Sequence, residues 1–151
     1  MSSQTHQSQY AGPRAQMNEQ FEPYHAEDLQ PWETNYAMWI HLGALIAYVA
    51  AVIPSLGVAF PVPLIAALVL WLVHKHDSEF LDDHGREAVN FQISMCIFYM
   101  IAWVVGAMMF CVGYYITLPL VSIFGIVGCA MGAYAGKQGQ IYRYPATIRF
   151  L

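Results

Sequence analysis

Two long stretches without any charged residue constrain this chain more than any other feature. No Lys, Arg, Asp or Glu occurs from Thr34 to His74, and none occurs from Ala88 to Gly136. Both stretches are apolar, and both exceed the roughly 20 residues that cross a bilayer as one helix. Charged residues make up 11% of the chain, against about 25% in soluble domains. We therefore interpret the chain as an integral membrane protein with one small membrane domain.

Each charge-free stretch is too long for one crossing and is interrupted by turn residues. Pro54, Gly57 and Pro61 interrupt the first stretch, and the segment from Gly113 to Pro119 interrupts the second. Because a spanning segment must satisfy its own backbone hydrogen bonds, each half is expected to be a helix. The expected fold class is an all-α membrane protein with four transmembrane helices arranged as two hairpins. The spans cover about residues 36–53, 61–74, 88–112 and 118–134 of a domain at 34–151.

Polar segments flank these spans. Residues 1–33 are rich in Gln, Ser, Pro and acids, which predicts a disordered polar tail. Residues 1–30 contain no basic segment leading into an apolar core, so we expect no cleavable signal peptide. Between spans two and three, Asp77 or Ser78 can cap a short interfacial helix. Gly85 is a candidate for a bend where this helix meets span three.

The basic residues sort to one side of this arrangement. Arg14 lies in the tail, Lys75 and Arg86 in the middle loop, and the last three basic residues follow Gly136. The two hairpin turns contain none. Basic residues favour the cytoplasmic side, so we expect a multi-pass protein of the cytoplasmic membrane with both termini in the cytoplasm. The net charge of −4 argues against a nucleic-acid partner, because such proteins carry basic surfaces.

Small residues recur every four positions in two of the expected spans. Gly128, Gly132 and Gly136 do so in span four, and Gly43 and Ala47 in span one. Such strips allow two helix backbones to approach closely. Packing within the bundle and association between chains both remain open, and we favour packing within the bundle.

Polar residues near the cytoplasmic end form the candidate site. His41 lies about one turn inside span one, where it suits the interface or a bond to a neighbouring helix. Glu87, Asn90 and Ser94 share one helical face, which suits either a water-filled vestibule or hydrogen bonding between helices. The full set for a partner-binding or structural cluster is His41, Asp82, Asp83, His84, Arg86, Glu87, Asn90, Gln92, Ser94, Tyr142, Arg143 and Tyr144.

Catalytic, metal and cofactor sites are disfavoured by the spacing of the reactive residues. His74, His76 and His84 lie near several Asp residues, but no two of these histidines are three or four positions apart. Cys96 and Met100 are four apart, yet one such pair is ordinary packing. The chain has no Ser-His-Asp pattern and no phosphate-binding loop. We expect no cofactor, no metal and no enzyme activity.

Opposite charges gather on the cytoplasmic side. From Lys75 to Glu87 there are five acids and two bases, a net charge of −3, whereas the segment after Gly136 carries three bases and no acid. We predict that Arg143 or Arg149 folds back toward Asp82, Asp83 or Glu87. The alternative is that the basic residues contact anionic lipid.

Three motifs carry a resemblance to a known family. They are Trp39 to Leu42, the run His84-Gly-Arg-Glu-Ala-Val-Asn-Phe-Gln92, and Gly139-Gln-Ile-Tyr-Arg-Tyr-Pro145. Over about residues 38–151 the chain resembles a family of small four-span bacterial membrane proteins of unknown function. That family is distantly similar to the Tic-twenty subunit of the chloroplast inner-envelope import machinery, and certain magnetosome membrane proteins resemble it too. The resemblance implies four spans, a bacterial inner membrane and no established catalytic residues.

Two functions follow as hypotheses. The first is a non-enzymatic accessory or scaffold subunit in the lipid bilayer, whose cytoplasmic face contacts a membrane-protein partner or another copy. The second is a component of a protein-translocation or channel-type pore, as the resemblance to Tic-twenty suggests. Asn90, Gln92 and Ser94 would line a vestibule near one end, but the sequence offers no polar path beyond them, so we prefer the first hypothesis.

Overall fold

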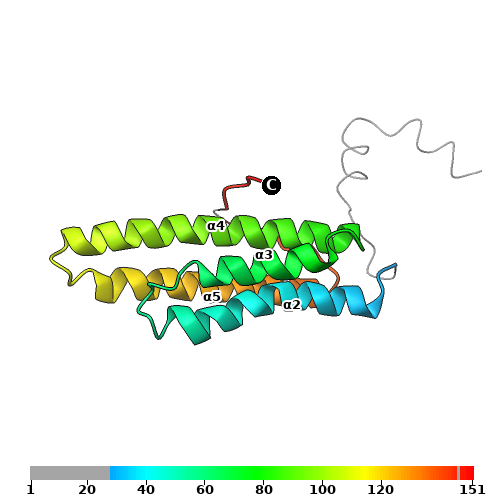
Figure 1. Cartoon of the computed structure of the whole chain (residues 1–151), viewed down its shortest axis with the longest axis horizontal. Helices are drawn as coiled ribbons and strands as arrows, with labels where there is room; N and C mark the ends of the chain where they lie inside the picture. Colours follow the sequence, from blue (N-terminus) through cyan, green and yellow to red (C-terminus); the bar gives the residue numbers. More distant parts are fainter. Residues whose placement is uncertain (1–27, 146) are drawn as a thin grey trace, which may run out of the picture.

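The protein is an antiparallel bundle of helices. The computed structural model describes residues 28–145 and 147–151, and within them every regular element is helical. The elements are α2 (Pro31–Ala47), the single-turn π-helix η2 (Tyr48–Val52), α3 (Val62–His74), α4 (Glu79–Met108) and α5 (Tyr114–Lys137). Consecutive helices run in opposite directions along one long axis (Figure 1). Most of the expected disordered tail, residues 1–27, lies outside the described residues.

Three helical segments are long and apolar enough to cross a membrane, namely Pro31–Val52, Glu79–Met108 and Tyr114–Lys137. The fourth, α3, is apolar but has 13 residues, which corresponds to about 20 Å at the usual helical rise. The expectation of an all-helical, multi-pass protein is met.

The helix ends follow local sequence signals. Pro31 is the first residue of α2, and the backbone N–H of Gln30 donates to the Glu33 carboxylate at 2.7 Å. Pro61 precedes α3, and Pro63 lies in its first turn, where the missing N–H costs nothing. The expected interfacial helix and span three form one helix of 30 residues, which begins after Ser78.

Two details differ from expectation, one inside the second apolar stretch and one just before it. The turn there closes by Gly113, so α5 begins at Tyr114 and contains Pro119. A sharp reversal at Phe110 and Cys111, which have φ of 53° and 66°, replaces the longer break that Pro119 suggested. Gly85 also has a role other than a bend. A methyl group at Gly85 would lie 1.9 Å from Cδ1 of Trp71, so this glycine lets the indole of α3 pack against α4.

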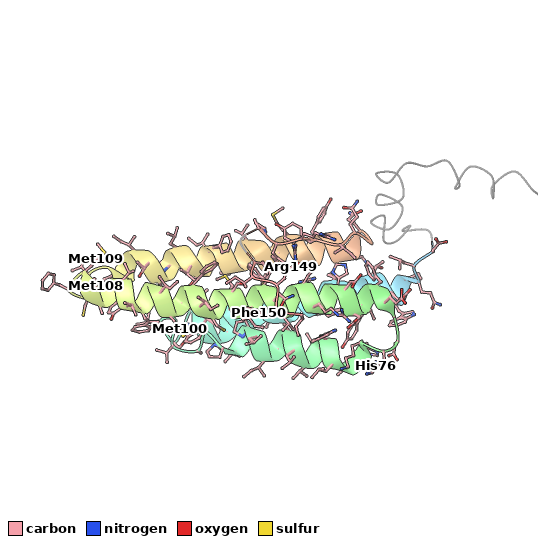
Figure 2. All side chains as sticks on the ribbon, turned by 90° about the horizontal axis from the view of Figure 1, so that it is seen from above. His76, Met100, Met108, Met109, Arg149 and Phe150 are labelled. Carbon is pink, nitrogen blue, oxygen red and sulfur yellow. The ribbon has the colours of Figure 1, made fainter. Side chains whose placement is uncertain are left out.

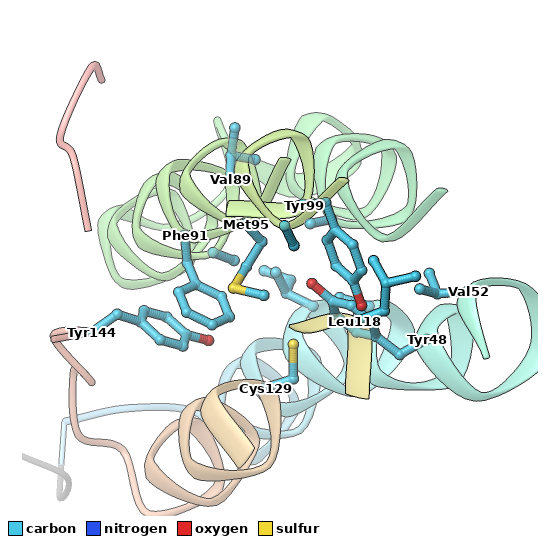
Figure 3. Close-up of a cluster of buried hydrophobic side chains, with 14 residues drawn as sticks. Tyr48, Val52, Val89, Phe91, Met95, Tyr99, Leu118, Cys129 and Tyr144 are labelled. Atoms are coloured by element: carbon cyan, nitrogen blue, oxygen red, sulfur yellow. The ribbon is translucent and has the colours of Figure 1, made fainter. Parts of the chain in front are cut away.

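Aromatic side chains fill the bundle interior. Tyr48, Phe91, Met95 and Tyr99 are fully buried between the helices (Figure 3). The phenol of Tyr48 donates to Gln92 at 3.0 Å, and the amide of Gln92 donates to Cys129 at 3.2 Å.

The small-residue strips face this interior. A methyl group on Gly128 would lie 2.4 Å from the ring of Phe91, and one on Gly136 would lie 3.0 Å from the backbone of Ala37. In α2, Gly43 faces Leu70 and Ala47 is buried. These glycines therefore act in packing within one chain.

Candidate functional site

Three buried side chains from distant parts of the sequence meet near the charged end of the bundle. Nε2 of His41 in α2 lies 3.0 Å from Nδ1 of His84 in α4, and Nδ1 of His41 lies 2.7 Å from the hydroxyl of Tyr144. All three residues are almost fully buried. We call these three residues the His-His-Tyr cluster. It joins α2 and α4 to the chain that follows α5.

Aromatic rings and one glycine hold this cluster in place. Phe80 contacts His84 edge to face, with the ring centroids 4.6 Å apart. Phe91 stacks on Tyr144 at 4.0 Å. On the α5 side, Gly132 leaves the necessary room, because a methyl group there would lie 2.3 Å from the Tyr144 oxygen and 2.8 Å from Nδ1 of His41.

The cluster can form one directed chain of hydrogen bonds with all three groups neutral. Burial raises the pKa of Tyr144 well above its ordinary value of 10, so its phenol stays protonated and can donate to His41. The Nε2–H of His41 can then donate to Nδ1 of His84. Nε2 of His84 is buried without a well-formed hydrogen bond, although the backbone of Gln140 lies close enough to interact with the imidazole.

This geometry limits how many protons the cluster can hold. With one extra proton on either imidazole, the contact between Nε2 of His41 and Nδ1 of His84 still joins one N–H donor to one nitrogen acceptor. Protonating both rings would place two N–H groups against each other across the 3.0 Å contact. The cluster therefore accepts at most one extra proton, and without charge it serves as a structural link.

The polar stripe on α4 holds the end of the chain. The backbone N–H of Ile148 donates to the Ser94 hydroxyl at 2.9 Å, and the N–H of Phe150 donates to Oδ1 of Asn90 at 3.0 Å. Nε of Arg149 lies 3.2 Å from a carboxylate oxygen of Glu87. The stripe that suggested a vestibule is thus occupied by residues of the same chain. Arg149 and Phe150 lie along the middle of the bundle, whereas Met108 and Met109 mark its far end (Figure 2).

A basic residue near the C-terminal end pairs with the acidic segment between Lys75 and Glu87, as expected: Arg149 forms an ion pair with Glu87. Arg143 has an interaction partner within the protein, and Tyr142 lies edge to face with Tyr144, with the ring centroids 4.9 Å apart. Asp83 likewise has an interaction partner within the protein.

The turn between α3 and α4 carries a second polar group. Asp82 accepts a hydrogen bond from the Trp71 indole at 2.8 Å and pairs with Arg86 at 2.5 Å. His74 pairs with Asp77 at 2.6 Å, so His74 and His84 point to different partners. Within residues 28–145 and 147–151, no three His, Cys, Asp or Glu side chains are grouped closely enough to hold a metal ion.

The opposite end of the bundle is uncharged. A cavity of about 530 Å³ opens there between η2, α4 and α5. Its lining includes Trp103, Tyr114, Ile126 and the polar Ser122, and no charged residue, so the lining is predominantly apolar. Nearby, Phe110 is 93% exposed and Leu56 is 76% exposed at the two turns.

Some site residues escaped the sequence analysis. Tyr48 and Cys129 bond to Gln92, and Phe80 covers His84, yet each resembles an ordinary apolar residue of a membrane helix. The hydroxyl of Tyr48 inside an apolar stretch was the available signal, because a buried phenol usually finds a hydrogen-bond partner.

Comparison with known proteins identifies a family match. Residues 33–151 match the model of the magnetosome magnetite crystal formation protein family, MamF/MmsF. No curated protein and no solved structure matches the chain. The matched region contains nearly all of the helical bundle and the whole candidate site. The expected membership in a family of small membrane proteins is met, and no comparison shows the expected distant similarity to Tic-twenty.

Proposed function

The chain belongs to the magnetosome magnetite crystal formation protein family, and on this premise we propose that it is a non-enzymatic accessory subunit of the magnetosome membrane. In this proposal it acts as a scaffold whose charged end contacts a protein partner. The division of the bundle into one charged and one uncharged end is the observation that carries the proposal.

The proposed topology has four spans in two hairpins. Lys75, Arg86, Lys137 and Arg143 lie at or beside the charged end, Arg149 pairs with Glu87 further along α4, and the turns at residues 53–61 and 109–113 contain no charge. The positive-inside rule then places the charged end and both termini in the cytoplasm of a bacterium. The short helix α3 would cross where the bilayer is thin or where neighbouring helices cover its ends.

The proposed partner surface is the turn between α3 and α4. His76, Asp77 and Glu79 are exposed there, and Asp77 also pairs with His74. The buried polar residues of the site form hydrogen bonds within the chain. Exposed charges next to a fixed scaffold favour recognition by a partner of complementary charge. A pore through one copy receives less support, because Tyr48, Phe91 and Tyr99 close the interior.

Affinity purification from a magnetosome-forming host tests this proposal. We expect a stable companion to co-purify with the wild type in mild detergent. The double variant Asp77→Asn, Glu79→Gln should lose that companion and alter crystal size in cells, while membrane insertion stays normal. The matched control, Asp77→Glu with Glu79→Asp, keeps both charges and should keep the companion. Full retention of the companion by the neutral variant would refute the assignment of this surface.

A further inference from the structure

A pocket of about 410 Å³ opens between the end of α3 and the first turns of α4. Its volume lies in the range of about 300–1,000 Å³ that is usual for small-molecule sites. We call it the α3–α4 pocket, and it is lined by Trp71, Lys75, His76, Asp82, Arg86 and Leu151. His76 marks this end of the bundle in Figure 2. Two basic side chains and an imidazole therefore gather around one indole ring.

Asp82 fixes two walls of the α3–α4 pocket. Its Oδ1 accepts a hydrogen bond from the Trp71 indole at 2.8 Å, and its Oδ2 pairs with Nη2 of Arg86 at 2.5 Å. Both carboxylate oxygens are therefore engaged, and Arg86 balances the negative charge of Asp82. The Arg86 side chain remains 50% exposed, so its guanidinium has further N–H donors to offer a ligand.

Lys75 supplies a second positive charge, and it forms no ion pair within residues 28–145 and 147–151. Its ammonium nitrogen lies 5.8 Å from the centre of the Trp71 ring, which places this charge over the indole. The side chains that line the pocket thus carry two positive charges and one negative charge, and the exposed His76 adds a hydrogen-bonding imidazole. A net positive pocket that presents a guanidinium favours an anion, and phosphate oxygens match the geometry of its N–H groups.

The pocket lies at the level of the lipid headgroups when the charged end of the bundle is at the membrane surface, and the inference rests on that part of the topology proposed above. Arg86 is two residues before Ala88, where the charge-free part of α4 begins, which is about 3 Å along a helix. Lys75 directly follows α3. Trp71 suits the same level, because Trp is enriched at membrane interfaces. Phosphate at this level belongs mainly to lipid headgroups.

We propose that the α3–α4 pocket binds the phosphate of an anionic phospholipid headgroup. Basic pockets between membrane helices on the cytoplasmic side commonly bind such headgroups. Apolar surface continues from the pocket along α3, because Leu72 and Leu68 precede Lys75 by three and seven positions and so share its face of the helix. They are 47% and 36% exposed, and one acyl chain of the lipid can lie along them. A free phosphate ion would gain nothing from this apolar surface, which favours the lipid.

Lipid binding to the full chain, delipidated in mild detergent and measured by native mass spectrometry, tests the proposal. Phosphatidylglycerol is the anionic probe, and phosphatidylcholine with the same acyl chains is the zwitterionic comparison. Each basic side chain near the headgroup contributes about fivefold in affinity for an anionic lipid. With two such side chains and one acid in the pocket, we expect the wild type to bind phosphatidylglycerol about tenfold more tightly than phosphatidylcholine. Equal affinity for the two lipids would overturn the proposal.

A pair of charge variants separates the pocket from general attraction to anionic lipid. Lys75→Gln breaks no ion pair among the described residues, and it should weaken phosphatidylglycerol binding about fivefold. Lys137→Gln is the matched control, because it removes the same charge at the same end of the bundle but outside the pocket. It should bind as the wild type does. Equal weakening in the two variants would mean that the surface charge attracts lipid without a site, and would overturn the proposal.

Inorganic phosphate distinguishes the lipid headgroup from the free ion. Millimolar phosphate should displace no more phosphatidylglycerol from the wild type than sodium chloride does at the same ionic strength. Displacement by phosphate alone would identify the free ion as the ligand and would overturn the assignment to a lipid.

The outcomes separate this inference from the proposed function. The binding measurement needs no partner protein and applies to either orientation of the bundle, because both membrane surfaces carry headgroups. Loss of the phosphatidylglycerol preference with the companion retained refutes the lipid site alone. Loss of the companion assignment with that preference retained refutes the proposed partner surface alone.

Discussion

Replacing Gly132 by Ala should destabilise the protein, although Ala is the better helix former. The added methyl group would lie 2.3 Å from the Tyr144 oxygen and 2.8 Å from Nδ1 of His41. Neither group can move freely. Tyr144 is stacked on Phe91 at 4.0 Å, and His41 is held between Tyr144 and His84.

The magnitude follows from two opposing terms. Ala in place of Gly favours a helix by about 1 kcal/mol, whereas a methyl group forced into a well-packed interior costs about 1–3 kcal/mol. Because the neighbours of Gly132 are fixed on several sides, we expect the upper part of that range. The net loss in the free energy of unfolding is then about 1–2 kcal/mol.

A double-mutant cycle with Tyr144→Phe tests the physical cause. This variant alone should cost about 1–3 kcal/mol, because it leaves a buried nitrogen of His41 without its partner. It also removes the atom nearest to the added methyl group. The two losses should therefore combine to less than their sum, by about 1 kcal/mol.

Reversible unfolding in mixed micelles, followed by helical circular dichroism, measures these free energies. Ala130→Leu adds bulk to an exposed position of α5 and should change stability by less than about 0.5 kcal/mol. A Gly132→Ala variant that is as stable as the wild type, or strictly additive losses in the cycle, would refute the close contact between α5 and the cluster.

Three further outcomes are expected. Gly85→Ala should displace the Trp71 side chain, shift tryptophan emission and lower the free energy of unfolding by about 1–3 kcal/mol. Unchanged emission would contradict the packing of the Trp71 indole on Gly85, where an added methyl group would lie 1.9 Å from Cδ1. Asn90→Ala should speed amide hydrogen exchange at Phe150 and Leu151, because both N–H groups donate to its side chain; protection equal to wild type, measured by mass spectrometry, would exclude that attachment. Since burial raises the pKa of Tyr144, its contribution to stability should be constant below pH about 10 and fall above it, as the unfolded phenol ionises; an ultraviolet titration that shows every phenol ionising near pH 10 would contradict this.

The sequence predicts the helical class and the positions of the helices well, because the causes are local. Absence of charge over two long stretches marks the apolar helices, and Pro54, Gly57 and Pro61 mark the first turn. The approach of Arg149 to Glu87 was also predictable, since opposite charges gathered on one side of a small bundle. The shared face of Glu87, Asn90 and Ser94 follows from helical periodicity alone.

The contacts of the His-His-Tyr cluster could not be predicted from the sequence. His41 and Tyr144 are 103 residues apart in the sequence. Their contact depends on which face of α2 points into the bundle and on the path of the irregular segment after α5. Neither quantity is encoded by periodicity. The π-helical turn η2 is similar, because such a turn reflects packing around Tyr48 and Val52 more than local preference.

The orientation of the two ends tests the account most directly. Leu56→Cys and Gln138→Cys, each in a chain whose Cys111 is replaced by Ser, can be labelled with a membrane-impermeant thiol reagent in isolated, sealed magnetosome vesicles. The account predicts that Gln138→Cys, on the cytoplasmic surface, reacts at once and that Leu56→Cys reacts after the vesicles are opened. Immediate labelling of both positions, or of Leu56→Cys alone, would contradict the arrangement of two hairpins with their charged ends in the cytoplasm.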